Sequence, residues 1–373
     1  SGGTVNHRRQ HPEAIIIVKR ATIPLLSICL LLPFLVAPIF AQEPVVIYVM
    51  TDSRELNAEE IAAFETENPD IHVELIDTLA IDVPLTSTLM TALEVGNIPD
   101  LVRVQADDMP ALVEQGLLLD LTDYFTASSV ITFDDISAAA NYYKFNDRYY
   151  GLPKDWSLDF SIYVYTPAFE AAGIPIPSTT EPMTYAELAD IARQLTVRDG
   201  NAVIDYGLFI PYYERTITSI LIQRGISMFN DDYSEIHLTD NPDVLEVIRF
   251  FFDLTMEGVL NPDRSHMERA WTSYLPMFQW GYWYAGSISE ANLMYGQLTM
   301  LPAPTWDRTL PRLNTTIGPS GLTITAASSH PAEAYRFFEW YTAGAGAAER
   351  TRHGWGAPAL RSYFRLLPQD TLF

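Results

Sequence analysis

Cysteine is almost absent from this sequence. The single residue of this type, Cys29, lies in an apolar run near the start of the chain. If that run is removed on export, the remaining chain has no thiol, so it forms no disulfide and uses no cysteine nucleophile. The seven histidines are scattered along the chain without the spacing of metal ligands. We therefore expect neither a metal site nor a cofactor.

Basic residues are also scarce. The chain has 23 lysines and arginines against 47 aspartates and glutamates, which gives a formal net charge of -24. A surface of that sign repels phosphate backbones, so nucleic acid is excluded as a partner. Anionic lipid headgroups are disfavoured for the same reason.

The common catalytic motifs are missing. The sequence contains no G-x-S-x-G, no G-x-x-x-x-G-K-[ST] and no H-E-x-x-H. Asp155 and Asp159 are the best pair of acids for glycoside hydrolysis, but four residues of extended strand span roughly 13 Å. A glycosidase needs its carboxylates about 5 to 9 Å apart. We expect a protein that is not an enzyme, with glycoside hydrolysis as the rival interpretation.

The start of the chain is typical of an export signal. An uncharged run, 21–42, follows a basic segment and has Ala41 as a small residue at a possible cleavage site. The basic residues are Arg8, Arg9, Lys19 and Arg20. We interpret 1–41 as a signal peptide, although about 20 apolar residues could also remain as a membrane anchor. Either way the chain is exported, to the periplasm or the outer face of the cytoplasmic membrane.

The length of 373 residues suits two domains. In the first, a β-branched run at 45–50 precedes a helix start at Asn57 and Glu60, and residues 71–75 alternate as a second strand. Residues 99–104 predict a third strand. Such β-α-β units build parallel sheets, so the sequence predicts an α/β fold.

Acids follow two of these strands. Asp52 comes directly after the first strand, and Asp107 and Asp108 come after the third. Ligands of open α/β sheets bind outside the carboxyl ends of the strands. We therefore take Asp52 and Asp107 as candidate ligand residues, whereas Asp108 suits the N-cap of the next helix.

The stretch 151–157, followed by the alternating run 162–165, predicts a strand that crosses between two lobes. Gly151 and Pro153 favour an extended segment, in which Asp155 and Trp156 stand side by side. Sites for small molecules concentrate at domain junctions, so both are candidate ligand residues. The alternative is an ordinary strand with a surface Asp and a core Trp.

The second half is also mixed α/β. Thr184 and Glu187 form a capping box, and a helix beginning at Pro242 is predicted to turn Leu245, Ile248 and Phe252 inward. Residues 271–284 are dense in aromatic side chains, which suit the faces of sugar rings but also form hydrophobic cores. The candidates nearest to Gly281 are Trp280, Tyr282 and Trp283.

The order of these landmarks resembles the extracellular solute-binding proteins of ABC importers, in particular the carbohydrate-binding family that includes maltose-binding proteins. The likeness covers nearly all of the chain after the export signal. The stretches that carry it are E-N-P-D-I-H-V at 67–73, G-N-I-P-D at 96–100, G-L-P-K-D-W-S at 151–157, A-G-I-P at 172–175, G-Y-W at 281–283 and S-H-P-A-E-A-Y-R-F at 329–337. Residues 274–280 depart from the family pattern because they lack its Asn, Gly and Lys.

The resemblance implies a fold of the type II periplasmic binding proteins, with two α/β lobes hinged by crossover strands. Residues 42–153 and 303–341 would form lobe 1, and 154–302 and 342–373 lobe 2. Sugar contacts are implied at Asp155, Trp156 and Trp283, and also at Asp52, Asp107 and Trp355. The expected partners are a small-molecule ligand and the transmembrane subunits of a permease, and we expect a monomer.

The nature of the ligand stays open at this point. The aromatic side chains favour a sugar or oligosaccharide, whereas the acids also permit a polyamine. A sensor domain that presents its ligand to a membrane receptor would share the same fold.

Overall fold

The computed structural model describes residues 43–78, 85–96, 98–157, 160–211, 213–230, 234–261, 275–288, 294–311 and 317–368. The predicted signal peptide, 1–41, lies outside these ranges. Within them, no helix is both long enough and apolar enough to cross a bilayer.

The first sheet has five strands in the order β2-β1-β3-β14-β6. They are β1 (Val45–Thr51), β2 (Ile71–Asp77), β3 (Leu101–Gln105), β6 (Gly151–Ser157) and β14 (Ile317–Ile324). β1 pairs in parallel with β2 and β3, whereas β14 is antiparallel to both β3 and β6. The predicted parallel β-α-β arrangement of the first three strands is therefore confirmed.

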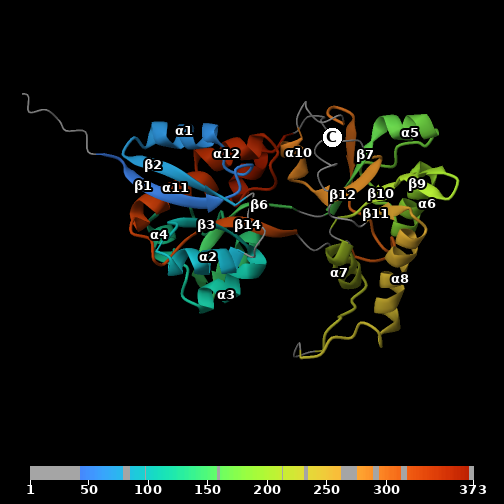
Figure 1. Ribbon diagram of the computed structural model, residues 1–373, viewed down its shortest axis with the longest axis horizontal. Coiled ribbons are helices and arrows are strands. Elements are labelled where there is room, and N and C mark those ends of the chain that lie inside the picture. Colours follow the sequence, from blue (N-terminus) through green and yellow to red (C-terminus); the bar gives the residue numbers. More distant parts are fainter. Residues whose placement is uncertain are drawn as a thin grey trace, which may run out of the picture. The chain divides into compact units, whose positions relative to one another are not determined.

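Helices cover both faces of this sheet (Figure 1). They are α1 (Ala58–Glu67), α2 (Leu85–Glu94), α3 (Met109–Glu114), α4 (Thr122–Ala127), α11 (Pro331–Thr342) and α12 (Ala345–Arg352). One core joins the sheet to α1 and α11, where Phe64 meets Phe337 with the ring centroids 4.9 Å apart. The other core joins it to α2 and α3 through Leu89 and Leu112. Coverage on both faces explains why the β1 sequence is continuously apolar.

The second sheet has the order β11-β10-β12-β7-β13. Its strands are β7 (Phe160–Tyr165), β10 (Leu208–Phe209), β11 (Leu260–Asn261), β12 (Met277–Gly281) and β13 (Leu298–Leu301). Around it lie α5 (Thr166–Ala172), α6 (Tyr185–Leu195), α7 (Tyr213–Gln223), α8 (Pro242–Met256) and α10 (Tyr284–Ser287). Two short hairpins complete the described strands, β4 (Lys144–Phe145) with β5 (Arg148–Tyr149), and β8 (Val197–Asp199) with β9 (Ala202–Asp205).

The two sheets share one topology. In each, three parallel strands are followed by an antiparallel fourth strand and then a fifth. The fourth strand of the first sheet, β14, follows β13 of the second sheet along the chain, and the fourth strand of the second, β7, follows β6 of the first. The predicted crossing between two halves is therefore present, and it falls between β6 and β7.

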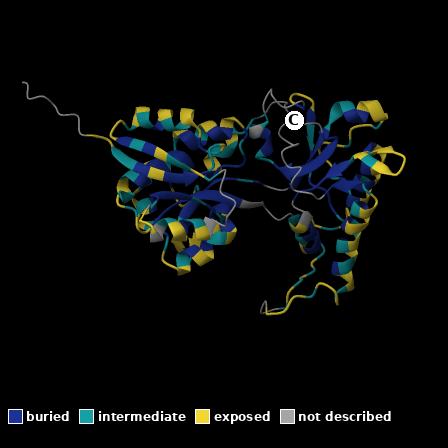
Figure 2. Cartoon of the chain, viewed as in Figure 1, coloured by how far each residue is buried: buried dark blue, intermediate teal, exposed yellow. Residues whose placement is uncertain are grey.

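Each half has its own hydrophobic core, as the buried strands in Figure 2 show. Both predicted capping boxes are confirmed, with Asn57 and Glu60 at the start of α1 and Thr184 and Glu187 at the start of α6. These caps satisfy backbone N–H groups that the first helical turn leaves without partners.

The inward face of α8 differs from the predicted one. Phe252 is 58% exposed, whereas Val247, Phe251 and Leu254 are buried. The predicted stripe lies one residue out of phase because α8 is apolar on several sides, so its periodicity does not identify the buried face.

The lobe boundaries also differ from the expected ones. The expected boundary after residue 153 divides β6, which lies wholly in the first sheet. Residues 342–373 are expected in lobe 2, but Ala343, Ala359 and Leu360 pack in the core of the first sheet. This segment follows α11 closely and buries apolar surface where α11 already lies.

Candidate ligand-binding site

The carboxyl ends of three strands meet at one edge of the first sheet. β1 and β3 are parallel, and β6 runs the same way because both β3 and β6 are antiparallel to β14. The residues at or just beyond these ends include Asp52, Asp107 and Asp155. The sheet therefore brings three predicted ligand residues to a single edge, which is the usual place for ligands in such sheets.

In the second sheet, the carboxyl end of β12 lies beside the start of β7, where the chain arrives from β6. β12 ends at Gly281, which pairs with Phe160 at the start of β7. Only residues 158 and 159 separate Phe160 from Ser157 at the end of β6. Three peptide steps span at most about 11 Å, so the two edges are tied closely together by the chain itself.

Asp155 is 8% exposed and accepts a hydrogen bond from the Nζ of Lys154. Lys154 Nζ also lies 4.0 Å from Glu55 Oε2, and the Nε of Arg103 lies 2.6 Å from that same oxygen. Glu55 follows β1, Arg103 belongs to β3, and Lys154 belongs to β6. We call these four side chains, Glu55, Arg103, Lys154 and Asp155, the ionic cluster; it contains two charges of each sign.

Trp156 is anchored to a late segment of the chain. Its backbone exchanges two hydrogen bonds with Ala357, of 3.1 and 2.7 Å, and its Nε1 donates to the carbonyl of Pro358 at 3.0 Å. Its ring meets Phe364 edge to face, with the centroids 6.1 Å apart. The side chain is half-buried, so part of its surface is exposed to solvent.

Trp355 belongs to the same late segment and is also half-buried. The Nζ of Lys154 lies 5.7 Å from the centre of its ring, within the range of a cation–π contact. Gly356, the next residue, has φ +103° and its backbone lies against the Asp155 side chain. The fold thus brings Trp355 to the neighbourhood of Asp155, although 200 positions separate them in the sequence.

Asp52 is held by Arg54. The Arg54 backbone N–H donates to Asp52 Oδ1 at 2.9 Å, and its guanidinium binds both carboxylate oxygens at 2.5 to 3.2 Å. Burial raises the pKa of Asp52, but these hydrogen bonds and the charge of Arg54 outweigh it and hold the pKa below its ordinary value. Asp52 is therefore ionised and already engaged.

Asp107 and Asp108 have different surroundings. Asp107 is exposed and forms a 3.2 Å ion pair with Arg215 of α7. Asp108 occupies the predicted N-cap position of α3, but its side chain makes no capping hydrogen bond. Burial, together with the charge of Asp107, raises the pKa of Asp108.

The aromatic candidates of the second half divide into core and surface. Trp280 is 0% exposed and packs among Phe278 and Tyr284, so we leave it out of the site. Trp283 and Tyr282 are half-buried and directly follow β12, and burial raises the pKa of the Tyr282 phenol. Trp271, Tyr274 and Asp159 lie outside the described residues.

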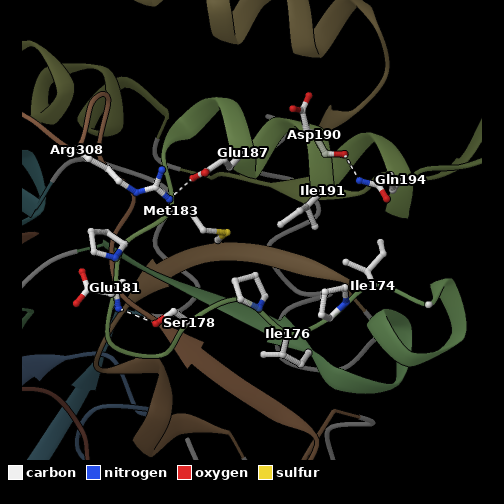
Figure 3. Close-up of a pocket in the computed structure, with 14 residues that line it drawn as sticks. Ile174, Ile176, Ser178, Glu181, Met183, Glu187, Asp190, Ile191, Gln194 and Arg308 are labelled. Atoms are coloured by element: carbon white, nitrogen blue, oxygen red, sulfur yellow. Dashed lines mark hydrogen bonds and ion pairs between the residues drawn. The ribbon is translucent and has the colours of Figure 1, made fainter.

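A pocket of about 510 Å³ lies elsewhere in the second half, between α6 and the loop that follows α5 (Figure 3). Ile174, Ile176 and Ile191 form much of its wall, and the 2.6 Å ion pair of Arg308 with Glu187 stands at one side. It contains none of the predicted ligand residues. The strand ends, where several predicted side chains lie, are therefore the candidate site.

Sequence reasoning missed the cations of the site. Lys154 belongs to the motif G-L-P-K-D-W-S, in which Asp155 and Trp156 are predicted ligand residues and Lys154 is not. Arg54 and Arg103 carried no signal, because an arginine in or just after a strand is ordinary. Among the described residues, no group of three His, Cys, Asp or Glu side chains is placed to hold a metal ion.

Comparison with solved structures confirms the fold. An ABC substrate-binding protein from Listeria monocytogenes, in complex with cycloalternan, is 19% identical, with a TM-score of 0.73 over 88% of this chain and 84% of that one. A solute-binding protein from Agrobacterium vitis with bound D-mannitol is 18% identical, with a TM-score of 0.69 over 86% and 79%. The GacH receptor of Streptomyces glaucescens is 17% identical, with a TM-score of 0.69 over 87% and 82%. The fold is that of the type II periplasmic binding proteins.

Comparison of sequences identifies the family. No curated protein matches the chain. The profile described as "Bacterial extracellular solute-binding protein" matches residues 50–348, which is well over half of the sequence. This match shows that the chain belongs to the family of bacterial extracellular solute-binding proteins.

Proposed function

We propose that this protein is the exported substrate-binding component of an ABC importer, and that it binds a neutral sugar, oligosaccharide or polyol and delivers it to a membrane permease. The site would lie near the carboxyl ends of the strands of the first sheet, by Ser157, and near Gly281 and Phe160 of the second sheet. Trp283 and Trp355 would stack on ring faces, while Asp52 and Asp155 would accept hydrogen bonds from hydroxyl groups.

The observation that carries the proposal is the pairing of each predicted ligand acid with a cation. Asp155 is bound by Lys154, Asp52 by Arg54 and Asp107 by Arg215. Such carboxylates still have lone pairs for hydroxyl donors, but they offer no unbalanced charge to a polyamine. The ligands of the similar structures, D-mannitol and acarbose among them, support the same class of solute.

A thermal-shift screen tests this proposal. A ligand that binds only the folded protein raises its Tm, so we expect one or more of maltose, mannobiose, D-tagatose and D-mannitol to do so. Putrescine and amino acids serve as comparison solutes and are expected to leave the Tm unchanged. A shift with putrescine alone would contradict the proposal.

The rival interpretation, a glycoside hydrolase, is tested with the ligand that the screen identifies. After incubation with the oligosaccharide that binds best, chromatography should recover it intact, because two carboxylates held by cations are poorly placed to act as acid and base. Release of monosaccharide would support a hydrolase instead.

A further inference from the structure

Lys154 occupies a place where lysine is rare. Its side chain is 4% exposed, and lysine is almost never buried to that degree unless it is paired. Its ammonium group has two acidic neighbours: Asp155 beside it on β6, and Glu55 in the segment after β1, 4.0 Å away. It also lies 5.7 Å from the centre of the Trp355 ring.

We propose that Lys154 is the residue that restricts this protein to uncharged ligands, by acting as a built-in counter-ion at the site. The inference rests on the proposed function in taking the strand ends as the ligand site. It goes further in assigning the choice between neutral and cationic solutes to one side chain that touches two predicted ligand residues.

The charges of the ionic cluster support this role. Two cations and two anions cancel there, in a chain whose acids outnumber its bases by about two to one. Without Lys154, Glu55 would keep the Nε of Arg103 at 2.6 Å, whereas Asp155 would lose its one ion pair among the described residues. The site would then carry an excess negative charge, partly shielded from water, and would attract a soluble amine.

A tethered ammonium group has an advantage over a dissolved one. Lys154 is part of β6, so it occupies the space beside Asp155 without losing the translational freedom that a free amine loses on binding. Its local concentration is set by the chain and not by the medium. A cationic solute therefore has to displace a competitor that never leaves the site.

Lys154 also positions an aromatic ring. Its Nζ lies 5.7 Å from the centre of the Trp355 ring, so one ammonium group contacts both that ring and Asp155. A neutral ligand would thus meet an ordered Trp355 ring next to an occupied Asp155. Loss of Lys154 should loosen the ring as well as expose the charge.

The test replaces Lys154 with a neutral residue of similar length. In Lys154→Met, we expect putrescine to bind about tenfold or more tighter than to the unmodified protein, measured by calorimetry. The gain should shrink as salt is added, because it is electrostatic. The double variant Lys154→Met with Asp155→Asn removes both partners and should lose the gain.

Lys144→Met is the matched control. Lys144 also forms an ion pair, at 2.9 Å with Asp147, and also lies over an aromatic ring, 5.8 Å from the centre of Tyr149. It is exposed and stands outside the ionic cluster. The substitution changes the net charge equally, so it should bind putrescine no better than the unmodified protein does.

The outcomes separate the two proposals. If Lys154→Met folds but binds putrescine no more tightly than the unmodified protein or than Lys144→Met, Lys154 does not restrict the ligand, whatever sugars the protein binds.

If Lys154→Met does not fold, Asp155→Asn provides the test. This variant leaves the charge of Lys154 in excess, so it should bind D-glucuronate more tightly than D-glucose. The opposite order would overturn the proposed role of Lys154. Failure of every neutral solute to bind the unmodified protein would instead contradict the proposed function.

Discussion

The indole Nε1 of Trp156 donates a 3.0 Å hydrogen bond to the carbonyl oxygen of Pro358, a residue 202 positions later in the sequence. The backbones of Trp156 and Ala357 form a two-way bridge beside it. The end of β6, where the chain leaves the first sheet, is therefore fastened to the segment that carries Trp355. Three predicted ligand residues, Asp155, Trp156 and Trp355, therefore lie at or beside this junction.

Trp156→Phe removes the donor of that hydrogen bond but keeps a ring against Phe364. Because the carbonyl of buried Pro358 then loses its partner, we expect the free energy of unfolding to fall by about 1 to 3 kcal/mol. Urea denaturation followed by circular dichroism measures this. An unchanged midpoint would mean that the hydrogen bond contributes nothing to stability.

Trp283→Ala should weaken binding of the best sugar in the screen by about 1 to 3 kcal/mol, the range of a buried aromatic contact. Its neighbour Trp280, 5.6 Å away between ring centroids, provides the comparison. Because Trp280 is fully buried, Trp280→Phe should lower stability and leave the affinity of the folded protein nearly unchanged. Calorimetry that shows equal affinities for Trp283→Ala and the unmodified chain would remove Trp283 from the site.

Gly356→Ala should disturb the site through its packing. An added Cβ would lie 2.8 Å from the Cβ of Asp155, and the residue has φ +103°, where side chains are rarely accepted. We expect a loss of about 1 to 3 kcal/mol in stability, together with weaker sugar binding.

Gly173→Ala is the control for that substitution. Gly173 also has positive φ, +69°, but a Cβ there meets nothing within 4 Å. It should lose roughly 1 kcal/mol from the backbone conformation alone and bind sugar normally. Equal effects of the two substitutions on binding would contradict the proposed contact with Asp155.

Asp52→Asn should reduce the acid sensitivity of the protein. The pKa of Asp52 is lower in the folded protein than in the unfolded chain, so its contribution to stability is present above the unfolded pKa, about 3.9. That contribution is lost as the pH falls through the folded pKa. Thermal melts between pH 7 and pH 2 should show a shallower acid decline for Asp52→Asn, and an identical decline would argue against the Arg54 pairing.

The crossover and the parallel sheet could be predicted from the sequence because both depend on local patterns. Gly151 and Pro153 indicate an extended stretch, and the apolar run at 45–50 reflects a strand buried on both faces. The helix starts at Asn57 and Thr184 follow from capping chemistry, which acts within one turn.

Features that depend on distant contacts could not be predicted in this way. The ionic cluster joins Glu55, in the segment after β1, to residues of β3 and β6, and nothing in the sequence near Lys154 indicates that Glu55 lies 4.0 Å away. Trp280 and Trp283 stand three residues apart in one aromatic run, yet one is core and the other partly exposed. The phase of α8 was missed because its neighbours, and not its own periodicity, decide which side is covered.

The position of β14 between β3 and β6 has a consequence for biosynthesis. Until residues 317–324 leave the ribosome, the facing edges of β3 and β6 have no strand to join them, and such edges invite pairing with other chains. The first half, although it begins the sequence, is completed almost last. A nascent polypeptide of this kind stays incompletely folded through most of its synthesis, which is the condition in which a chain can be threaded across a membrane.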